Sequence, residues 1–159
     1  MKKIMLFIFL AWCRGGLAQN VDSLLNDHRT VFGHIDRDRR EGITFRLTGV
    51  YTRDEVIYYS IEAWNHSPLV YDVDGIRCSI RDRKMMKRHA FQEITMAPLW
   101  IKGDSLRLGA GKRAVWIIAL RKEVLPPDQY LSIQLLEQWG SRNLEVRVGS
   151  RILMKAKLL

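Results

Sequence analysis

The feature that most constrains this chain is an alternation of apolar and polar residues that begins at Ile43 and recurs toward the C-terminus. The run "ITFRLT" (residues 43–48) shows it first, because every second side chain is apolar. Side chains along a β-strand point to opposite faces with a period of two, whereas an amphipathic helix repeats its apolar positions after three and four residues. The alternation therefore predicts strands with one buried and one wet face.

Gly, Pro, Asn and Asp interrupt the alternation at spacings of roughly 8 to 15 residues, as turns between short strands do. The segments so delimited are 43–48, 56–64, 75–83, 91–101 (ending near Pro98), 114–120, 129–139, 144–148 and 151–158. The unbroken apolar run "AVWIIAL" is expected in the middle of a sheet. Because the connections are too short for crossover helices, we predict an all-β fold, a single antiparallel Ig-like β-sandwich of seven to eight strands.

Residues 1–18 are typical of a cleaved export signal. A basic "MKK" precedes the apolar "IMLFIFLAW" and the small-residue exit "GGLA", so cleavage is expected after Ala18. The apolar run is too short to span a membrane. Residues 19–42 are predicted to form a short helix followed by an irregular charged segment, ahead of the sandwich domain at 43–159.

The two cysteines carry different expectations. Lipid attachment at Cys13 needs a small residue just before it, and because Trp12 stands there we do not expect lipidation. Removal of the signal leaves Cys78 as the only thiol, which excludes an intramolecular disulfide. Cys78 alternates with Ile76 and Ile80, so a buried apolar role is expected, with an intermolecular bridge as the alternative.

The chain carries 26 Lys and Arg against 17 Asp and Glu, a surplus that favours nucleic acid, anionic lipid or acidic proteins as partners. The basic residues stand in "RDRR", "RDRKMMKR", "GKR" and "LRK" with acids between them, which is typical of turns and solvated strand faces. No RNA-recognition or helix-turn-helix signature is present, so direct nucleic-acid binding is not predicted.

The sequence "GAGK", which ends at Lys112, is similar to the end of a phosphate-binding loop. Such a loop needs a further glycine at the position of Leu106, a hydroxyl at that of Arg113 and a helix afterwards. The chain instead continues into the apolar strand "AVWII". We therefore interpret "GAGK" as a turn in which Gly109 and Gly111 adopt positive φ. Lys112 and Arg113 are expected to face water.

The other polar residues do not form a recognisable catalytic or metal site. Four histidines lack the ligand spacing of a zinc site: His28, His34, His66 and His89. Asp72 and Asp74 are similar to the start of a calcium loop, but Arg83 stands where its closing glutamate should be. No "GxSxG" elbow is present. We therefore expect no cofactor and no enzymatic activity, and keep a hydrolase with an unrecognised site as the last of the alternatives.

Aromatic and basic residues near loops are the candidates for contact with a partner. Trp64 and Trp116 stand in or beside apolar strands and are expected in the core. Trp100 and Trp139 stand at strand ends next to loops, where tryptophan is common in interfaces. With the outward basic residues added, the candidate interface residues are Trp100, Trp139, Lys112, Arg113, Arg81 and Arg83.

With its strands placed, the chain resembles the TraN proteins of Bacteroidetes conjugative transposons. The residues that carry the similarity are "LTGVYTRDEVIYYSIEAWNHSPLVYDVDGIRCSIRDRKMMKRHAFQEITMAPLWIKGD" and "LGAGKRAVWIIALRKEVLPPDQYLSIQLLEQWGSRNLEVRVGSRILMKAKLL", with "LLNDHRTVFG" ahead of them. TraN proteins carry a further N-terminal domain, where this chain has only residues 19–42. The chain is therefore similar to the C-terminal half of the family with its own export signal. It is interpreted as either an accessory subunit or a short copy of the family protein.

The resemblance implies a structural role. TraN is similar in kind to the outer-membrane-ring subunit of type IV secretion systems, whose β-sandwich assembles with other channel core subunits and a small lipoprotein. It therefore implies an oligomeric periplasmic scaffold, peripherally associated with the outer membrane, that is not an enzyme. The alternative is a free-standing periplasmic or surface binding module that takes a carbohydrate or protein ligand on aromatic loop residues.

Overall fold

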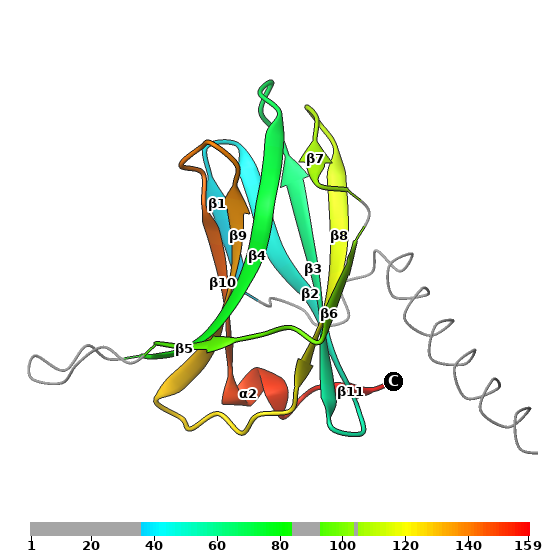
Figure 1. The fold of residues 1–159 in the computed structure, drawn as a ribbon, viewed down its shortest axis with the longest axis vertical. Helices are drawn as coiled ribbons and strands as arrows, with labels where there is room; N and C mark the ends of the chain where they lie inside the picture. Colours follow the sequence, from blue (N-terminus) through cyan, green and yellow to red (C-terminus); the bar gives the residue numbers. More distant parts are fainter. Residues whose placement is uncertain (1–35, 84–92, 104) are drawn as a thin grey trace, which may run out of the picture.

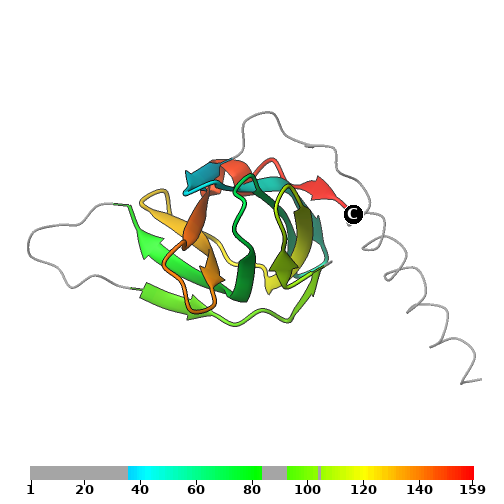
Figure 2. The same cartoon turned by 90° about the horizontal axis from the view of Figure 1, so that it is seen from above.

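The computed structural model of the chain describes residues 36–83, 93–103 and 105–159. The predicted signal, the predicted N-terminal helix and the "KMMKRH" connection lie outside the described residues. Within these ranges the secondary structure is almost entirely strand, in two sheets that face each other (Figures 1 and 2). In the same ranges, no helix is long and apolar enough to cross a membrane.

The first sheet has six strands in the order β1-β2-β3-β8-β6, with β11 pairing β2 in parallel. Its members are β1 (Arg37–Arg40), β2 (Ile43–Arg53), β3 (Val56–Asn65), β6 (Trp100–Gly103), β8 (Arg113–Arg121) and β11 (Lys157–Leu158). The second sheet has five strands in the order β10-β9-β4-β5, with β7 beside β4. Its members are β4 (Tyr71–Asp82), β5 (Glu93–Met96), β7 (Arg107–Leu108), β9 (Gln129–Glu137) and β10 (Leu144–Gly149), after which comes the short helix α2 (Ser150–Leu153).

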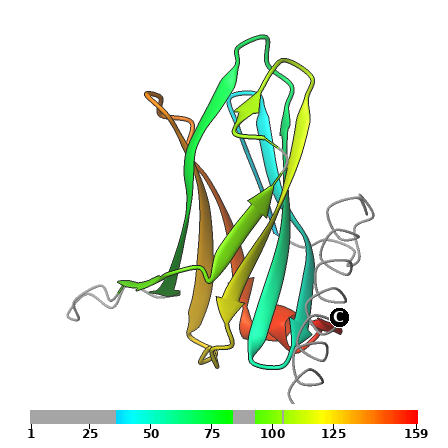
Figure 3. The same ribbon diagram turned by 45° about the vertical axis from the view of Figure 1, so that its right-hand side comes forward.

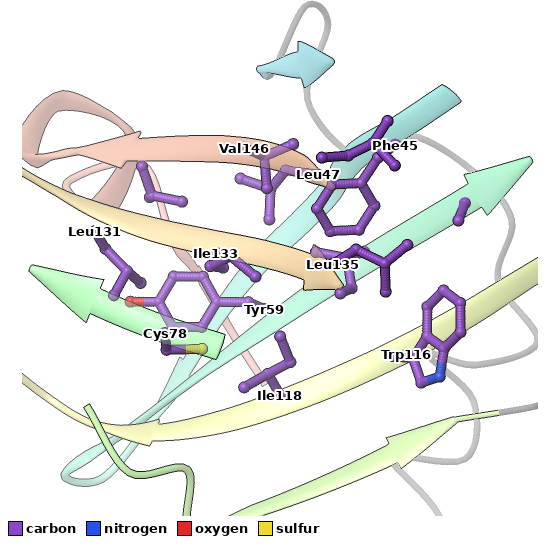
Figure 4. Close-up of a cluster of buried hydrophobic side chains, with 14 of the residues drawn as sticks. Phe45, Leu47, Tyr59, Cys78, Trp116, Ile118, Leu131, Ile133, Leu135 and Val146 are labelled. Carbon is purple, nitrogen blue, oxygen red and sulfur yellow. The ribbon is translucent and has the colours of Figure 1, made fainter. Parts of the chain in front are cut away.

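The core lies between the two sheets, where alternate side chains of the long strands meet (Figure 4). The inward-facing residues include Phe45, Tyr59, Cys78, Trp116 and Ile133. Strand β8 pairs with β3 on one side and β6 on the other, and its residues 114–120 are all buried. The packed sheets confirm the predicted all-β sandwich, and "AVWIIAL" lies inside a sheet as its composition indicates.

The strand predicted to end near Pro98 does end there, as β5, but the inclusion of residues 100 and 101 in it is wrong, because they begin a second strand in the other sheet. Strand β5 pairs with β4, whereas β6 pairs with β8. Pro98 lies in the link between them and lacks the amide proton that a continuous ladder requires. The chain therefore crosses between the sheets here (Figure 3), and β6 becomes the edge of the six-stranded sheet.

The predicted strand at residues 151–158 is also wrong for most of its length, because it begins as α2 and ends as the two-residue β11. Ile152 and Leu153 are consecutive, and both pack against the core. Consecutive side chains of a strand point to opposite faces, so an extended segment would not turn both toward the core. The local alternation of "RILMKAKL" was therefore a misleading signal.

The charged segment "RDRR", which we expected to be irregular, forms β1 and joins the sandwich. It pairs with β2. The carboxylates of Asp36 and Asp38 also accept hydrogen bonds from the main-chain amides of Arg147 and Glu145 in β10, at 2.6 and 3.1 Å. Main-chain pairing and these polar contacts hold a strand that has no apolar face. Because of such short edge strands, the described chain has eleven strands rather than seven or eight.

Candidate protein-binding surfaces

The turn between β9 and β10 presents Trp139 to solvent. The residue is 98 % exposed, and its φ of 59° lies in the left-handed region that residues with a Cβ seldom adopt. Burial of a tryptophan side chain is strongly favourable. A fully exposed tryptophan on an ordered turn therefore indicates a candidate contact with a partner. The structure thus places this candidate residue at the end of the sandwich where the β9–β10 turn lies, which we call the loop end.

Glu137 and Arg142 close the turn on which Trp139 stands. The Glu137 carboxylate accepts a hydrogen bond from Arg142 Nε at 2.8 Å and another from the Arg142 main-chain amide at 3.0 Å. Both side chains are about nine-tenths buried. The main-chain amide of Gln138 donates to the carbonyl of Asp72 at 2.8 Å, which ties the turn to β4. Trp139 is therefore held on a braced turn.

Arg142 also joins this turn to the loop before β4. Its Nη2 donates to the carbonyl of Val70 at 2.7 Å, and its guanidinium lies 5.2 Å from the ring centre of Tyr71. Leu69 and Val70 of that loop are 68 % and 38 % exposed. We call Leu69, Val70 and Trp139 the loop-end patch, since one arginine fixes both segments that carry it.

The electrostatics of the brace follow from these contacts. Burial by itself raises the pKa of Glu137, but hydrogen bonds and charge from Arg142 outweigh it, so the net pKa is lowered. The hydrogen bond to Glu137 raises the pKa of Arg142 in turn. The pKa of the Tyr71 hydroxyl is raised, first by burial and then by the Glu137 charge. The pair is therefore ionised at neutral pH.

A pocket of about 460 Å³ opens at the side of the sandwich, and we call it the side pocket. Its lining residues are Val73, Gly75, Ile76, Ile101, Gly103, Ser105, Leu106 and Trp116. The walls of the side pocket are two sheet edges. Strand β6 is the last strand of its sheet, and residues 74–77 of β4 pair, among the described strands, only with β9. The mouth carries Ile101 and Leu106, which are 40 % and 67 % exposed.

Two glycines give the side pocket its shape. A Cβ on Gly103 would lie 1.9 Å from Cδ1 of Trp116, so the indole packs directly on the β6 main chain. A Cβ on Gly75 would have no atom within 4 Å, so this position opens into empty space. A register shift between Val73 and Gly75 marks a bulge in β4 at the same place, and such bulges commonly re-aim side chains beside binding sites.

Trp100 lies on β6, away from the Trp139 turn. It is 38 % exposed, and its ring centre is 5.8 Å from that of Tyr58. Tyr58 belongs to a small apolar cluster of Tyr51, Tyr58, Ile117 and Ala119, distinct from the main core. Trp100 is therefore partly used by the protein's own packing. Because Trp100 lies on β6 of one sheet and Trp139 on the β9–β10 turn of the other, the structure does not bring them into one platform.

Arg81 and Arg83 contact other strands of the same sheet. The Arg81 guanidinium contacts Glu93 at 2.8 Å and Glu145 at 3.2 Å, and the Arg81 hydrogen bond is the main cause of the lowered pKa of Glu93. Arg83 Nε donates to the carbonyl of Gln129 at 3.3 Å. Only about a fifth of the Arg81 side chain is exposed, so its charge is largely used within the fold.

Arg113 and Lys112 lie at the entry to β8. The Arg113 guanidinium lies 3.8 Å from the ring centre of Trp64 and 3.7 Å from the Glu62 carboxylate. Lys112 is exposed in the turn, and its amide donates to the carbonyl of Gly109 at 3.1 Å. Half of the Arg113 side chain remains exposed, so both residues stay accessible to a partner.

Two details of this region correct the sequence-based expectations. Gly111 has the expected positive φ of 70°, whereas Gly109 does not. Trp116 is buried in the core as expected, but Trp64 is half-buried beneath Arg113. The reason is its position: Trp64 stands between the buried residues Ala63 and Asn65 and so faces away from the other sheet.

Sequence reasoning missed the Glu137–Arg142 brace and the side pocket. The brace joins residues within "EQWGSR", and no spacing rule marks a turn of this kind. The pocket arises where two sheet edges from distant segments face each other, so only the topology reveals it. In the part of the chain that the structure describes, no group of three or more His, Cys, Asp or Glu side chains is placed to hold a metal ion.

Comparison with known proteins gives one family match and one structural match of interest. A family model described as "Domain of unknown function (DUF4138)" matches residues 17–158. No curated protein matches the sequence. Among solved structures, the chain is similar to the archaellum periplasmic stator protein FlaG from Sulfolobus acidocaldarius, with 13 % identity and a TM-score of 0.41, covering 66 % of this chain and 98 % of that one.

Proposed function

Because the chain belongs to the family described as domain of unknown function DUF4138 and resembles the TraN proteins, we propose that it is a structural subunit of a conjugative type IV secretion apparatus. In this proposal the exported chain is a periplasmic scaffold, peripherally associated with the outer membrane. Its partners are other core subunits of the conjugation channel and a small lipoprotein. It acts by binding proteins and not as an enzyme.

The observation that supports a scaffold most strongly is the loop-end patch. Interface hot spots are enriched in tryptophan, and a residue that is already ordered loses little conformational entropy when it is buried by a partner. Trp139 meets both conditions, since it is 98 % exposed on a turn braced by Glu137 and Arg142. Leu69 and Val70 are further exposed apolar residues, on the loop that Arg142 joins to the Trp139 turn.

A carbohydrate platform made from Trp100 and Trp139 has less support. Stacking on a sugar needs aromatic rings on one surface, whereas Trp100 lies on β6 of one sheet and Trp139 on a turn of the other. Trp100 also packs against Tyr58. We therefore prefer a protein partner to the carbohydrate ligand of the alternative interpretation.

Conjugal transfer is the activity that tests the proposal. Deleting the gene should lower transfer frequency by orders of magnitude, and the wild-type chain supplied in trans should restore it. Trp139→Ala should restore transfer poorly although the protein accumulates normally. Trp100→Ala is the matched control and should restore most of the transfer. Undiminished transfer in the deletion strain would contradict the proposed function.

A further inference from the structure

The same molecule carries an exposed apolar knob and an apolar hole. The knob is the indole of Trp139, on the side of β4 where β9 pairs. The hole is the side pocket, on the other side of β4 and facing β6. Because Trp139 is 98 % exposed, it does not occupy the pocket of its own chain.

The pocket suits an indole in size and polarity. Pockets of about 300–1,000 Å³ bury drug-sized ligands, so 460 Å³ leaves room for one indole ring. Val73, Ile76 and Trp116 offer apolar walls. The indole N–H needs one acceptor when buried. Ser105 lies in the wall, and its hydroxyl donates to the Arg107 carbonyl while accepting one bond from the Arg107 amide, which leaves a lone pair for an incoming donor.

We propose that Trp139 of one copy inserts into the side pocket of the next copy, so that the chains associate head to tail. Knob and hole are different surfaces, so the contact is heterologous and repeats from copy to copy. Such a contact generates a closed ring when the rotation between copies closes, and an open filament otherwise. The inference deepens the proposed function, on which it rests for its biological meaning, because a ring subunit needs a repeating contact.

The contact is expected to be weak in isolation. A stable interface buries about 800 Å² on each partner, whereas one tryptophan supplies about 250 Å². Leu69 and Val70, on the loop that Arg142 joins to the Trp139 turn, and Leu106 at the pocket mouth can add to this area. The association should therefore depend on protein concentration and strengthen in the membrane-bound assembly.

The test uses two variants that each remove one half of the contact. Trp139→Ala removes the knob. Leu106→Asp places a charge at the pocket mouth, where Leu106 is 67 % exposed, and so opposes entry of an indole. Ile101→Asp, at the same mouth on β6, is a second hole variant if Leu106→Asp does not fold. Circular dichroism checks the fold of each variant, and Trp100→Ala is the control that keeps both halves.

Sedimentation velocity of the mature chain over a range of concentrations measures the result. Wild type and Trp100→Ala should form a series of oligomers, and each single variant alone should remain monomeric. An equimolar mixture of Trp139→Ala with Leu106→Asp should stop at dimers, because only one knob and one hole remain per pair. A monomeric wild type at every concentration, or a mixture that remains monomeric, overturns the inference.

The outcomes separate this inference from the proposed function. If the mixture forms dimers but deletion of the gene leaves conjugal transfer intact, the head-to-tail contact stands and the secretion role fails. If transfer requires the chain but the mixture stays monomeric, the role stands and the knob-and-hole contact fails.

Discussion

Glu137 accepts hydrogen bonds from both the side chain and the main chain of Arg142, and this pair closes the turn that exposes Trp139. Removing the charge of one partner leaves the other buried with unmet hydrogen bonds, which costs more than the intact pair contributes. Glu137→Gln should therefore lower the free energy of unfolding by about 2 kcal/mol. Denaturant unfolding followed by circular dichroism measures it, and Glu123→Gln, at an exposed position, should change stability little.

Acidification should destabilise the protein through the same carboxylate. Arg142 outweighs burial and holds the pKa of folded Glu137 below its ordinary value of 4.5. A carboxyl group whose pKa is lower in the folded state than in the unfolded state contributes its full stabilisation above the unfolded-state pKa. That contribution is lost as the pH falls through the folded-state pKa. Unfolding free energy should thus be flat near neutral pH and decline below about 4.5. The decline should be shallower in Glu137→Gln, and an unchanged slope would argue against the brace.

Gly103→Ala should disturb the core from the edge strand. The added Cβ would lie 1.9 Å from Cδ1 of Trp116, so the indole or β6 must move. Overpacking of this kind costs about 1–3 kcal/mol. Gly75→Ala is the matched control, because its Cβ meets empty space. Equal unfolding midpoints for the two variants would show that Trp116 does not pack on β6 as described.

Cys78 should be inert in the folded protein. It is 1 % exposed, and burial raises the pKa of its thiol to about 12. The reactive thiolate is therefore scarce and shielded at mildly alkaline pH. Iodoacetamide should label Cys78 only after unfolding, as intact-mass spectrometry of the mature chain can show. Rapid labelling of the native protein would place Cys78 outside the core.

The side-chain period predicted the first part of β2, because residues 43, 45 and 47 are buried there and residues 44 and 46 are less so. Residues 56–64, which turn residues delimit, became most of β3 although residues 57–63 are all buried and show no alternation. The same signal failed at the short strands, where main-chain pairing with a distant partner decides the structure. "RDRR" forms β1 without an apolar face, and residues 91–101 divide between two sheets although they read as one strand.

The candidate surfaces were predictable only in part. Trp139 was found because a tryptophan beside a loop suggests an interface, whereas the partners of Arg81 and Arg113 depend on strand register that the sequence does not encode locally. The side pocket could not be predicted from the sequence, because it forms between two sheet edges whose residues lie far apart along the chain. Long-range topology therefore accounts for most of what sequence reasoning missed.

The most direct test of the scaffold role is the mass of the complex that contains the chain after the cell envelope has been solubilised with detergent. An affinity tag placed just after the predicted cleavage site permits purification from detergent-solubilised envelopes, followed by size-exclusion chromatography and mass spectrometry. We predict that the wild-type chain elutes at high mass with other conjugation-channel subunits, and that Trp139→Ala shifts toward the monomer. A wild-type chain recovered as a free monomer from the periplasmic fraction would contradict the account.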